Sequence, residues 1–332
     1  MIGASTRKMT YVCSLALLAI STTVGAYAYA ENYPDHPIKL LVGFSAGSGN
    51  DTAGRIVGEI LTEQLGQPAV VENKTGANGS LAVQTVAKAK PDGYTLLVSN
   101  TSSITVNPLI NKDIAYDPER DLEPITTLLG YPLVLTINAT AEKTKNVRTV
   151  KDLVELAKSQ KEPLTYGSAG IGNLFHIAGA LFVKEAGIEA THIPYRGGTP
   201  MRVALLSGEI DFAFNTLDTV PLVKDGRVRA LAVTEHERWR DLPDVPTMDE
   251  VGLPSIYISP WFGVFAPKGT PPDVLSKLND ALSGLSTNVE LRKKLEAIGR
   301  VEINGPKAFA EKIKKETAIN KEIIAREGIA AR

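Results

Sequence analysis

The sequence lacks the features that mark a disulfide-bonded, nucleic-acid-binding or membrane-spanning protein. Its 332 residues include 1 cysteine, Cys13, so no disulfide can form within the chain. The chain has 36 Lys and Arg residues and 37 Asp and Glu residues, with no block of like charges and no basic surface rich in aromatic residues. This balance argues against nucleic acid and anionic membranes as partners. After residue 30, no apolar run approaches the roughly 18 residues of a membrane span.

Metal-binding and nucleotide-binding motifs are missing as well. The 4 histidines form no H-E-x-x-H motif and no other clustered ligand spacing. The stretch GSGND lacks the lysine of a P-loop, and the turn from Ala77 to Ser80 does not match the dinucleotide fingerprint. We therefore expect neither a metal nor a cofactor.

The N-terminus has the pattern of an export signal. Arg7 and Lys8 precede the apolar or small residues Tyr11 to Val24, and Ala28-Tyr29-Ala30 supplies an A-x-A cleavage site. We expect residues 1–30 to be a signal peptide that is cleaved after Ala30. A retained membrane anchor is the alternative, because Tyr11 to Ala30 carries no charge.

From Pro37 onward, short β-rich runs alternate with amphipathic segments. The first set predicts strands at Ile38 to Phe44, Ala69 to Glu72 and Tyr94 to Ser99, and helices at Thr52 to Leu65 and Ser80 to Lys88. The second set predicts helices at Val150 to Ser159, Leu174 to Ala186 and Pro200 to Leu206, and strands at Leu164 to Tyr166, Thr191 to Pro194, Ile210 to Phe214 and Val228 to Val233. Helices at Asp273 to Gly284, Val289 to Ile298 and Pro306 to Glu327 follow. This order predicts right-handed βαβ units and parallel sheets.

Two such sets predict an α/β protein of two doubly wound lobes joined by a hinge. We expect residues 31–130 plus 256–332 to form lobe 1, and residues 131–255 to form lobe 2. The candidate crossings are the loop around Gly130-Tyr131-Pro132 and the proline-rich passage near Pro254.

The loops that follow the predicted strands are rich in small and hydroxyl-bearing residues. They read FSAGSGND from Phe44, SNTSSIT from Ser99, YGSAGIGN from Tyr166, YRGGT from Tyr195 and NTLDT from Asn215. Glycine lets a backbone approach a ligand closely, and the first N–H groups of a helix lack intrahelical partners, which suits a carboxylate or phosphate. Helix capping alone would explain any one of these loops, and Asn50 or Asp51 is a good N-cap. Five such loops in two lobes favour a ligand site between them.

Two single residues allow alternative interpretations. Gly43-Phe44-Ser45-Ala46-Gly47 matches the G-x-S-x-G pattern of a nucleophilic serine, but the loop continues past the second glycine and no partner motif follows. His176 falls in the first turn after YGSAGIGN, where it could face a ligand or serve a structural role.

Longer motifs resemble the periplasmic solute-binding receptors of tripartite tricarboxylate transporters, often called Bug proteins. The resemblance covers essentially the whole chain after residue 30. It rests on YPDHPIKLLVGFSAGSGND, NGSLAVQTVAKAKPDGYTLL, LTYGSAGIGNLFHIAG, THIPYRGGTPMRVALLSGEIDFAF, GRVRALAVT and RDLPDVPTMDEVG in this order.

The resemblance implies a class II periplasmic binding protein that closes on a small carboxylate. Backbone N–H groups and bridging waters are expected to hold the acid. The positions that match the family's ligand loops are Phe44, Ser45, Ala46, Gly47 and Asp51 in lobe 1 and Ser168, Gly172, Asn173, His176 and Tyr195 in lobe 2. Ser102 and Asn215 are extrapolated from their loops.

This chain departs from the family at Ser45-Ala46-Gly47-Ser48, where a proline and paired glycines are usual, so extra hydroxyls could change which acid fits. Arg196 could pair with a second acid group or be solvated, and we favour the solvated state.

The resemblance predicts a periplasmic, non-enzymatic monomer that delivers an organic acid to the membrane permease subunits of a tripartite transporter. Two other functions stay open at this stage. The same closed form could instead signal to a sensor kinase, or Ser45 could serve a secreted hydrolase.

Overall fold

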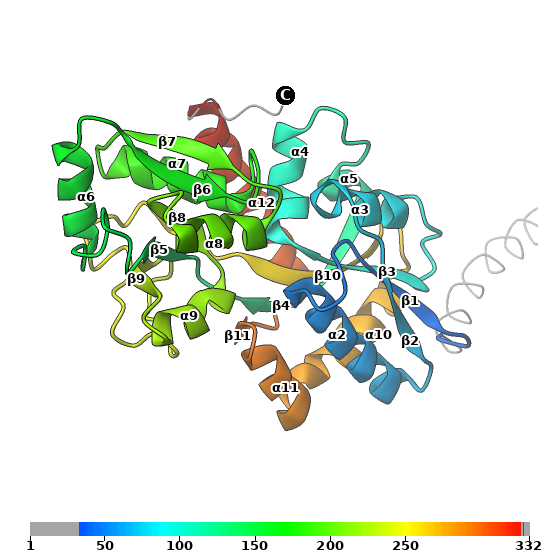
Figure 1. Cartoon of the computed structure of the whole chain (residues 1–332). Helices are drawn as coiled ribbons and strands as arrows, with labels where there is room; N and C mark the ends of the chain where they lie inside the picture. Colours follow the sequence, from blue (N-terminus) through cyan, green and yellow to red (C-terminus); the bar gives the residue numbers. More distant parts are fainter. Residues whose placement is uncertain (1–32, 327, 329–332) are drawn as a thin grey trace, which may run out of the picture.

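The computed structural model describes residues 33–326 and 328, which form two lobes side by side (Figure 1). The predicted signal peptide, residues 1–30, lies outside the described residues, as does Glu327 at the end of the last predicted helix. In the part of the chain that is described, no helix is both long and apolar enough to cross a membrane.

Lobe 1 is built on a six-stranded sheet in the order β11-β4-β10-β3-β1-β2. Its strands are β1 (Ile38–Val42), β2 (Ala69–Asn73), β3 (Thr95–Asn100), β4 (Leu122–Gly130), β10 (Trp261–Pro267) and β11 (Arg300–Val301). Its helices are α2 (Gly49–Leu65), α3 (Ser80–Ala87), α4 (Asn107–Ile110), α5 (Pro118–Asp121), α10 (Pro272–Ser283) and α11 (Val289–Glu296), with the short turns η1 (Ala77–Gly79), η2 (Ser102–Val106) and η4 (Gly284–Ser286).

Lobe 2 is built on a five-stranded sheet in the order β7-β6-β8-β5-β9. Its strands are β5 (Val134–Asn138), β6 (Leu164–Ser168), β7 (Ala190–Pro194), β8 (Phe212–Asn215) and β9 (Val228–Val233). Its helices are α6 (Val150–Ser159), α7 (Leu174–Glu185), α8 (Gly198–Ser207) and α9 (Val220–Lys224), with the short turn η3 (Leu217–Thr219). The helix α6 and the strand β9 have the predicted bounds.

The two-lobed α/β fold is confirmed, but the prediction of parallel sheets is wrong for one central strand in each lobe. β10 pairs antiparallel with both β3 and β4, and β5 pairs antiparallel with both β8 and β9. These two strands are the ones by which the chain enters each lobe from the other. The chain arrives at the edge where the parallel strands end, so the entering strand must run back through the sheet in the opposite direction.

The two crossings between the lobes are hydrogen-bonded to one another. The Tyr131 N–H donates to the Pro260 carbonyl at 3.0 Å, which joins the first crossing to the second. Thr234, at the start of the second crossing, adds two hydrogen bonds to Leu133 of the first. Its hydroxyl accepts from the Leu133 N–H at 2.9 Å, and its own N–H donates to the Leu133 carbonyl. The hinge is therefore a short paired ribbon rather than two independent linkers.

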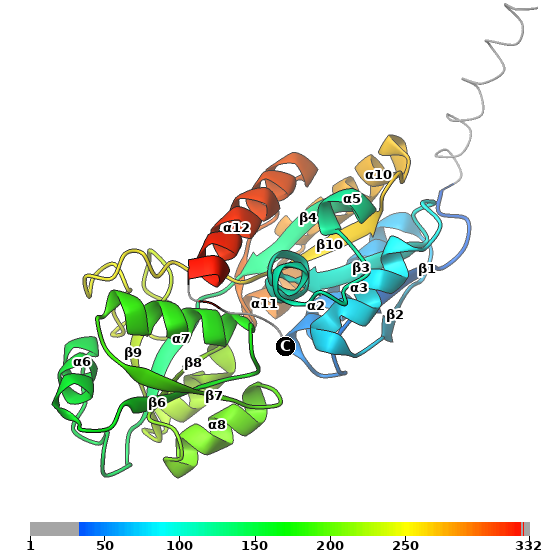
Figure 2. The same ribbon diagram turned by 90° about the horizontal axis from the view of Figure 1, so that it is seen from above.

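The C-terminal helix α12 (Pro306–Arg326) forms a third link (Figure 2). Its first half packs Phe309 and Ile313 against lobe 1, in a cluster with Trp261. Its last turns place Ile323 and Ile324 in the core of lobe 2. The sheets occupy residues 38–130 with 261–301 and residues 134–233, while the exact lobe boundaries given above stay a prediction.

Candidate functional site

The first ligand loop lies between β1 and α2, and Asp51 holds it in shape. Ser48 caps α2 by accepting a hydrogen bond from the Asp51 N–H at 3.2 Å. The buried Asp51 carboxylate accepts from the Gly47 N–H, Arg55 Nε and Asn73 Nδ2, each at 2.9 Å. Because these donors occupy both carboxylate oxygens, Asp51 supports the loop rather than presenting itself to a ligand.

Burial alone would raise the pKa of the Asp51 carboxyl. The hydrogen bonds from Arg55, Gly47 and Asn73 outweigh it and hold that pKa below its usual value. The side chain therefore stays ionised at neutral pH and keeps its three donors in place.

The free donors of this loop are backbone N–H groups. Ser45 and Ala46 are exposed, and within residues 33–326 their N–H groups have no hydrogen-bond partner. The N–H groups of Gly49 and Asn50 lie in the first turn of α2 and have no intrahelical partner. In Figure 1 the start of α2 lies near the centre of the molecule, on the side of lobe 1 that faces lobe 2. These donors could hold an anionic group.

A buried polar network fixes the neighbouring turn η1. Ala77 and Asn78 have positive φ values of 45° and 52°. The Asn78 carbonyl accepts from the Ser103 hydroxyl at 2.9 Å and from Asn107 Nδ2 at 3.1 Å, which holds this left-handed turn. A Cβ on Gly43 would lie 2.6 Å from the Gly79 Cα, so η1 packs directly against the end of β1.

Ser102, extrapolated from the sequence, is buried in η2 at the end of β3. Its neighbour Ser103, and not Ser102, carries the hydrogen bonds to the turn. The Ser102 hydroxyl has no hydrogen bond to another described residue.

The second ligand loop follows β6 in lobe 2 and is held by two histidines. The fully buried Ser168 hydroxyl donates to the Gly170 carbonyl at 2.9 Å and lies 2.7 Å from His192 Nε2. Since that hydroxyl proton is already used, His192 Nε2 must carry the proton of the second bond. The Gly172 N–H donates to His176 Nδ1 at 3.0 Å, and Asn173 caps α7 through its Oδ1.

Both imidazoles are held in the neutral state. Burial lowers the pKa of His176. Burial and the neighbouring His176 lower the pKa of His192 to about 4. The predicted ligand residue His176 is thus engaged through Nδ1 with the loop itself. His192, on the neighbouring strand β7, is part of the same support.

The second loop also touches lobe 1. Gly172 has a φ of +71°, and a Cβ there would lie 2.1 Å from the Ile110 Cδ1 of α4. Val106 and Ile110 belong to the hydrophobic cluster that contains Leu174 and Ile177 of lobe 2. This contact was not predicted, because no helix was expected at Asn107–Ile110.

The remaining predicted positions differ in their surroundings. The Tyr195 hydroxyl donates to Glu209 Oε1 at 2.7 Å, so this side chain is bonded within lobe 2. Arg196 is exposed and forms no ion pair with any described residue. Asn215 ends β8 and is 1% exposed, with Nδ2 donating to the Thr136 hydroxyl at 2.8 Å.

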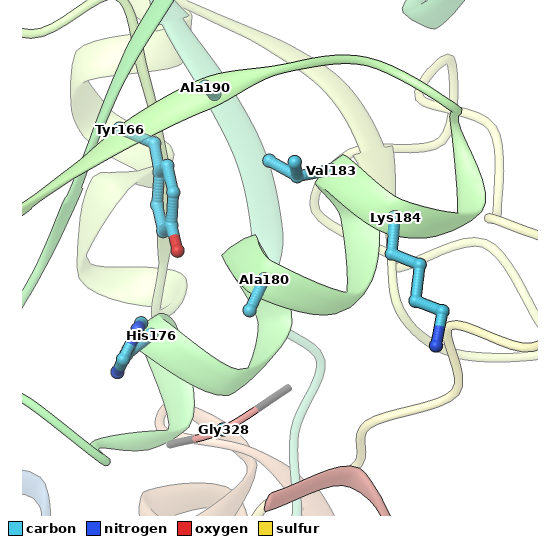
Figure 3. Close-up of a pocket in the computed structure, with 7 residues that line it drawn as sticks. All are labelled: Tyr166, His176, Ala180, Val183, Lys184, Ala190 and Gly328. Carbon is cyan, nitrogen blue, oxygen red and sulfur yellow. The ribbon is translucent and has the colours of Figure 1, made fainter. Parts of the chain in front are cut away.

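A cavity of about 300 Å³ lies behind the second loop (Figure 3). It is lined by Tyr166, His176, Ala180, Val183, Lys184, Ala190 and Gly328. No residue of the first loop lines it, so it belongs to lobe 2 and the end of the chain rather than to the space between the loops. Its links to the second loop are Tyr166, which leads into the loop, and His176, which accepts from Gly172.

The geometry gives no support to catalysis by Ser45. The side chain is exposed, and in the described chain it is hydrogen-bonded to no histidine or carboxylate. The described residues also contain no group of three or more His, Cys, Asp or Glu side chains that could hold a metal ion.

The comparisons with known proteins agree on one family. The model of the tripartite tricarboxylate transporter family receptor matches residues 53–329. Protein BugT of Bordetella pertussis is 33% identical over 275 residues, which cover 82% of this chain and 83% of BugT.

Solved structures show the same fold over their full length. The periplasmic binding protein BugD has a TM-score of 0.77 and 31% identity, covering 90% of this chain and 100% of its own. Rpa4515 of R. palustris, solved with adipate, has a TM-score of 0.80 and 30% identity, again covering 90% and 100%.

Proposed function

Because this chain belongs to the tripartite tricarboxylate transporter receptor family of solute-binding proteins, we propose that it captures a small organic carboxylate between its two lobes. The acid would bind the loop Phe44–Gly47 and the first turn of α2 on one side, and the loop 168–173 on the other. Adipate in the similar Rpa4515 structure supports an acid of this size.

One observation carries the proposal most directly. The first loop presents the N–H groups of Ser45, Ala46, Gly49 and Asn50 without partners in the described chain, while Asp51 behind it keeps the loop rigid. Helix N-termini favour anions, and a pre-formed set of donors spares the cost of ordering the loop on binding. A carboxylate fits these donors without a dedicated arginine.

The contact between the lobes suggests how capture could be read by a partner. Ile110 lies against Gly172, a residue of the second ligand loop, so the position of lobe 1 and the shape of that loop are linked. We propose that the acid favours the closed arrangement and that the closed form delivers it to the permease subunits of the transporter. The protein would act in the periplasm after cleavage near Ala30, as a monomer without catalytic activity.

A thermal-melting panel tests the proposal. A bound ligand stabilises the native state by RT ln(1 + [L]/Kd), so an acid at about 100 times its Kd should add about 2.7 kcal/mol. The panel should contain mono-, di- and tricarboxylates, each beside the uncharged amide of the same carbon skeleton. We expect at least one acid to raise the melting temperature and its amide to have no effect. A panel in which no acid shifts the melt, confirmed by flat calorimetric titrations, would refute carboxylate capture.

A further inference from the structure

Within the described residues, four buried side-chain atoms have no hydrogen-bond partner. They are Asn50 Oδ1, Asn215 Oδ1, Thr219 Oγ1 and Asn279 Oδ1. Asn279 lies on α10, whereas Asn50 lies in the first turn of α2, Asn215 ends β8 opposite Val134 at the hinge end of β5, and Thr219 lies in the turn η3. Buried polar groups are normally paired, so an unpaired group calls for a partner that is not part of the chain.

Two aromatic rings connect the lobe 1 and lobe 2 members of this set. A Cβ on Gly49, next to Asn50, would lie 3.2 Å from the Phe262 ring. The Phe262 ring lies 5.3 Å from that of Tyr131 at the hinge. On the lobe 2 side, Asn215 pairs with Val134, which follows shortly after Tyr131 in the chain. The two rings thus form an apolar floor at the hinge, with Asn50 close to it in lobe 1 and Asn215 close to it in lobe 2.

The orientation of the Asn215 amide is fixed by its neighbours. The Thr136 hydroxyl donates its single proton to the Ala213 carbonyl at 2.8 Å, so it can only accept from Asn215. The group 2.8 Å from it must be the Asn215 NH₂. The carbonyl oxygen Oδ1 then points away from the sheet hydrogen bonds, and the residue is 1% exposed. Asn215 thus offers a dry acceptor at the lobe 2 edge of the floor.

We propose that Asn215 Oδ1 selects acids that carry a hydrogen-bond donor on the carbon chain, a hydroxyl or an ammonium group. The inference rests on the proposed function, because the carboxylate end of the same molecule would occupy the N–H groups of the first loop. A plain acid would leave the buried acceptor of Asn215 without a partner, and so would lack a hydrogen bond that the substituted acid gains.

Two matched series of acids test this selection by calorimetric titration of the full protein. One contains succinate, malate and aspartate, and the other contains propionate, lactate and alanine. Within at least one series we expect the hydroxy or amino member to bind on the order of tenfold or more tightly than the plain acid. Equal affinities for all members of a binding series would overturn the selection and leave carboxylate capture standing. If no member of either series bound but another acid of the melting panel did, the selection would be overturned and carboxylate capture would stand.

The variant Asn215→Leu tests whether Asn215 is responsible for the preference for substituted acids. Asn279→Leu is the matched control. Both changes remove an amide whose buried oxygen is unpartnered, but Asn279 lies on α10, away from the hinge floor. We expect Asn215→Leu to reduce the preference to near equality and Asn279→Leu to retain it. A preserved preference in Asn215→Leu would overturn the role of Asn215. The series measured on the unaltered protein decides the proposal even if Asn215→Leu fails to fold.

Discussion

The imidazole rings of His176 and His192 lie stacked, with centroids 3.7 Å apart and planes 5° apart. Each ring uses one nitrogen to hold the same loop, His176 at Gly172 and His192 at Ser168. Two charged rings at this distance would repel one another, and a protonated His176 could no longer accept from Gly172. The loop 168–173 therefore depends on both histidines remaining neutral.

Stability should fall as the pH falls from about 6.5 towards 4. The pKa of His192 is 6.5 in the unfolded chain but about 4 in the folded protein. Between these pH values the unfolded state binds more protons than the folded state, so acidification favours unfolding. The stability that the neutral His192 ring contributes is fully present above pH 6.5. His192→Gln keeps an N–H for Ser168 and cannot titrate. Thermal melts at several pH values should show that His192→Gln loses about 1–2 kcal/mol less stability on acidification than the unaltered protein. This figure is discounted for the partial exposure of the ring.

The pH experiment must be read as a difference between variants. Burial raises the pKa of Glu316 to about 7, so this group stabilises the folded protein as the pH falls from 7 towards 4.5 and opposes the histidine effect. If the profiles of His192→Gln and the unaltered protein coincided, the stacked pair would not control the acid sensitivity.

Asp51→Asn should weaken both the fold and ligand binding without removing a proposed ligand contact. The carboxylate accepts three hydrogen bonds, and an amide in its place would point NH₂ at one of the donors. We expect a loss of about 2–4 kcal/mol in stability by denaturant unfolding. Arg55→Met removes only the partly exposed partner and should cost less than about 1 kcal/mol. Equal losses for the two variants would show that the Gly47 and Asn73 bonds contribute little.

Gly172→Ala tests the contact between the lobes. Alanine at this position meets both an unfavourable positive φ and the Ile110 side chain, whereas Gly187 has a similar φ of +60° and nothing within 4 Å. The same change at Gly187 should cost about 1 kcal/mol from backbone strain alone. We expect Gly172→Ala to cost at least about 1 kcal/mol more and to weaken the binding of any acid found in the panel. Adding Ile110→Ala should recover part of the ligand affinity. Failure to recover any would argue against Ile110 as the obstacle.

Gly263→Ala should detach α12 from the sheet of lobe 1. Its Cβ would lie 2.3 Å from the Phe309 ring and 3.1 Å from the Thr126 carbonyl oxygen. Neither Phe309, which is fully buried, nor the strand backbone can move freely, so we expect a loss of at least about 2 kcal/mol in thermal or denaturant unfolding. Gly284→Ala is the control, because its Cβ meets only ordinary contacts at 3.5 Å or more. It should be neutral or stabilising by up to about 1 kcal/mol.

Hydrophobic periodicity predicted most of the longer helices and the strands that belong to βαβ units, but not the strands β4, β5 and β10 on either side of the crossings between the lobes. β4 leads directly into β5, and β9 is followed by β10 with no helix between them, so the alternating rhythm gives no signal for β4, β5 and β10. Trp261 and Phe262 sit in a stretch crowded with prolines, which resembles a loop until its pairing partners β3 and β4 are known. Tertiary pairing, rather than local preference, makes this stretch a strand.

In the candidate site, the position of each loop could be predicted from local sequence, but the role of each side chain could not. The glycine- and serine-rich composition of Phe44–Asp51 and 166–173 marked both loops. The inward role of Asp51 depends on Asn73, which is distant in sequence, and the stacking of His176 depends on His192 of the next strand. Side-chain direction in a loop is decided by such distant partners, so sequence alone could not separate a loop support from a ligand contact.

The position of β10 between β3 and β4 affects the order in which the chain can fold during synthesis. All five strands of lobe 2 are complete by residue 233, whereas the gap in the lobe 1 sheet cannot close until residues 261–267 have emerged. Domains generally fold as units in the order of their synthesis, but here the half that begins first must finish last. Residues 38–130 would meanwhile expose unpaired strand edges, and so the early part of this chain is where a holding chaperone would be most needed.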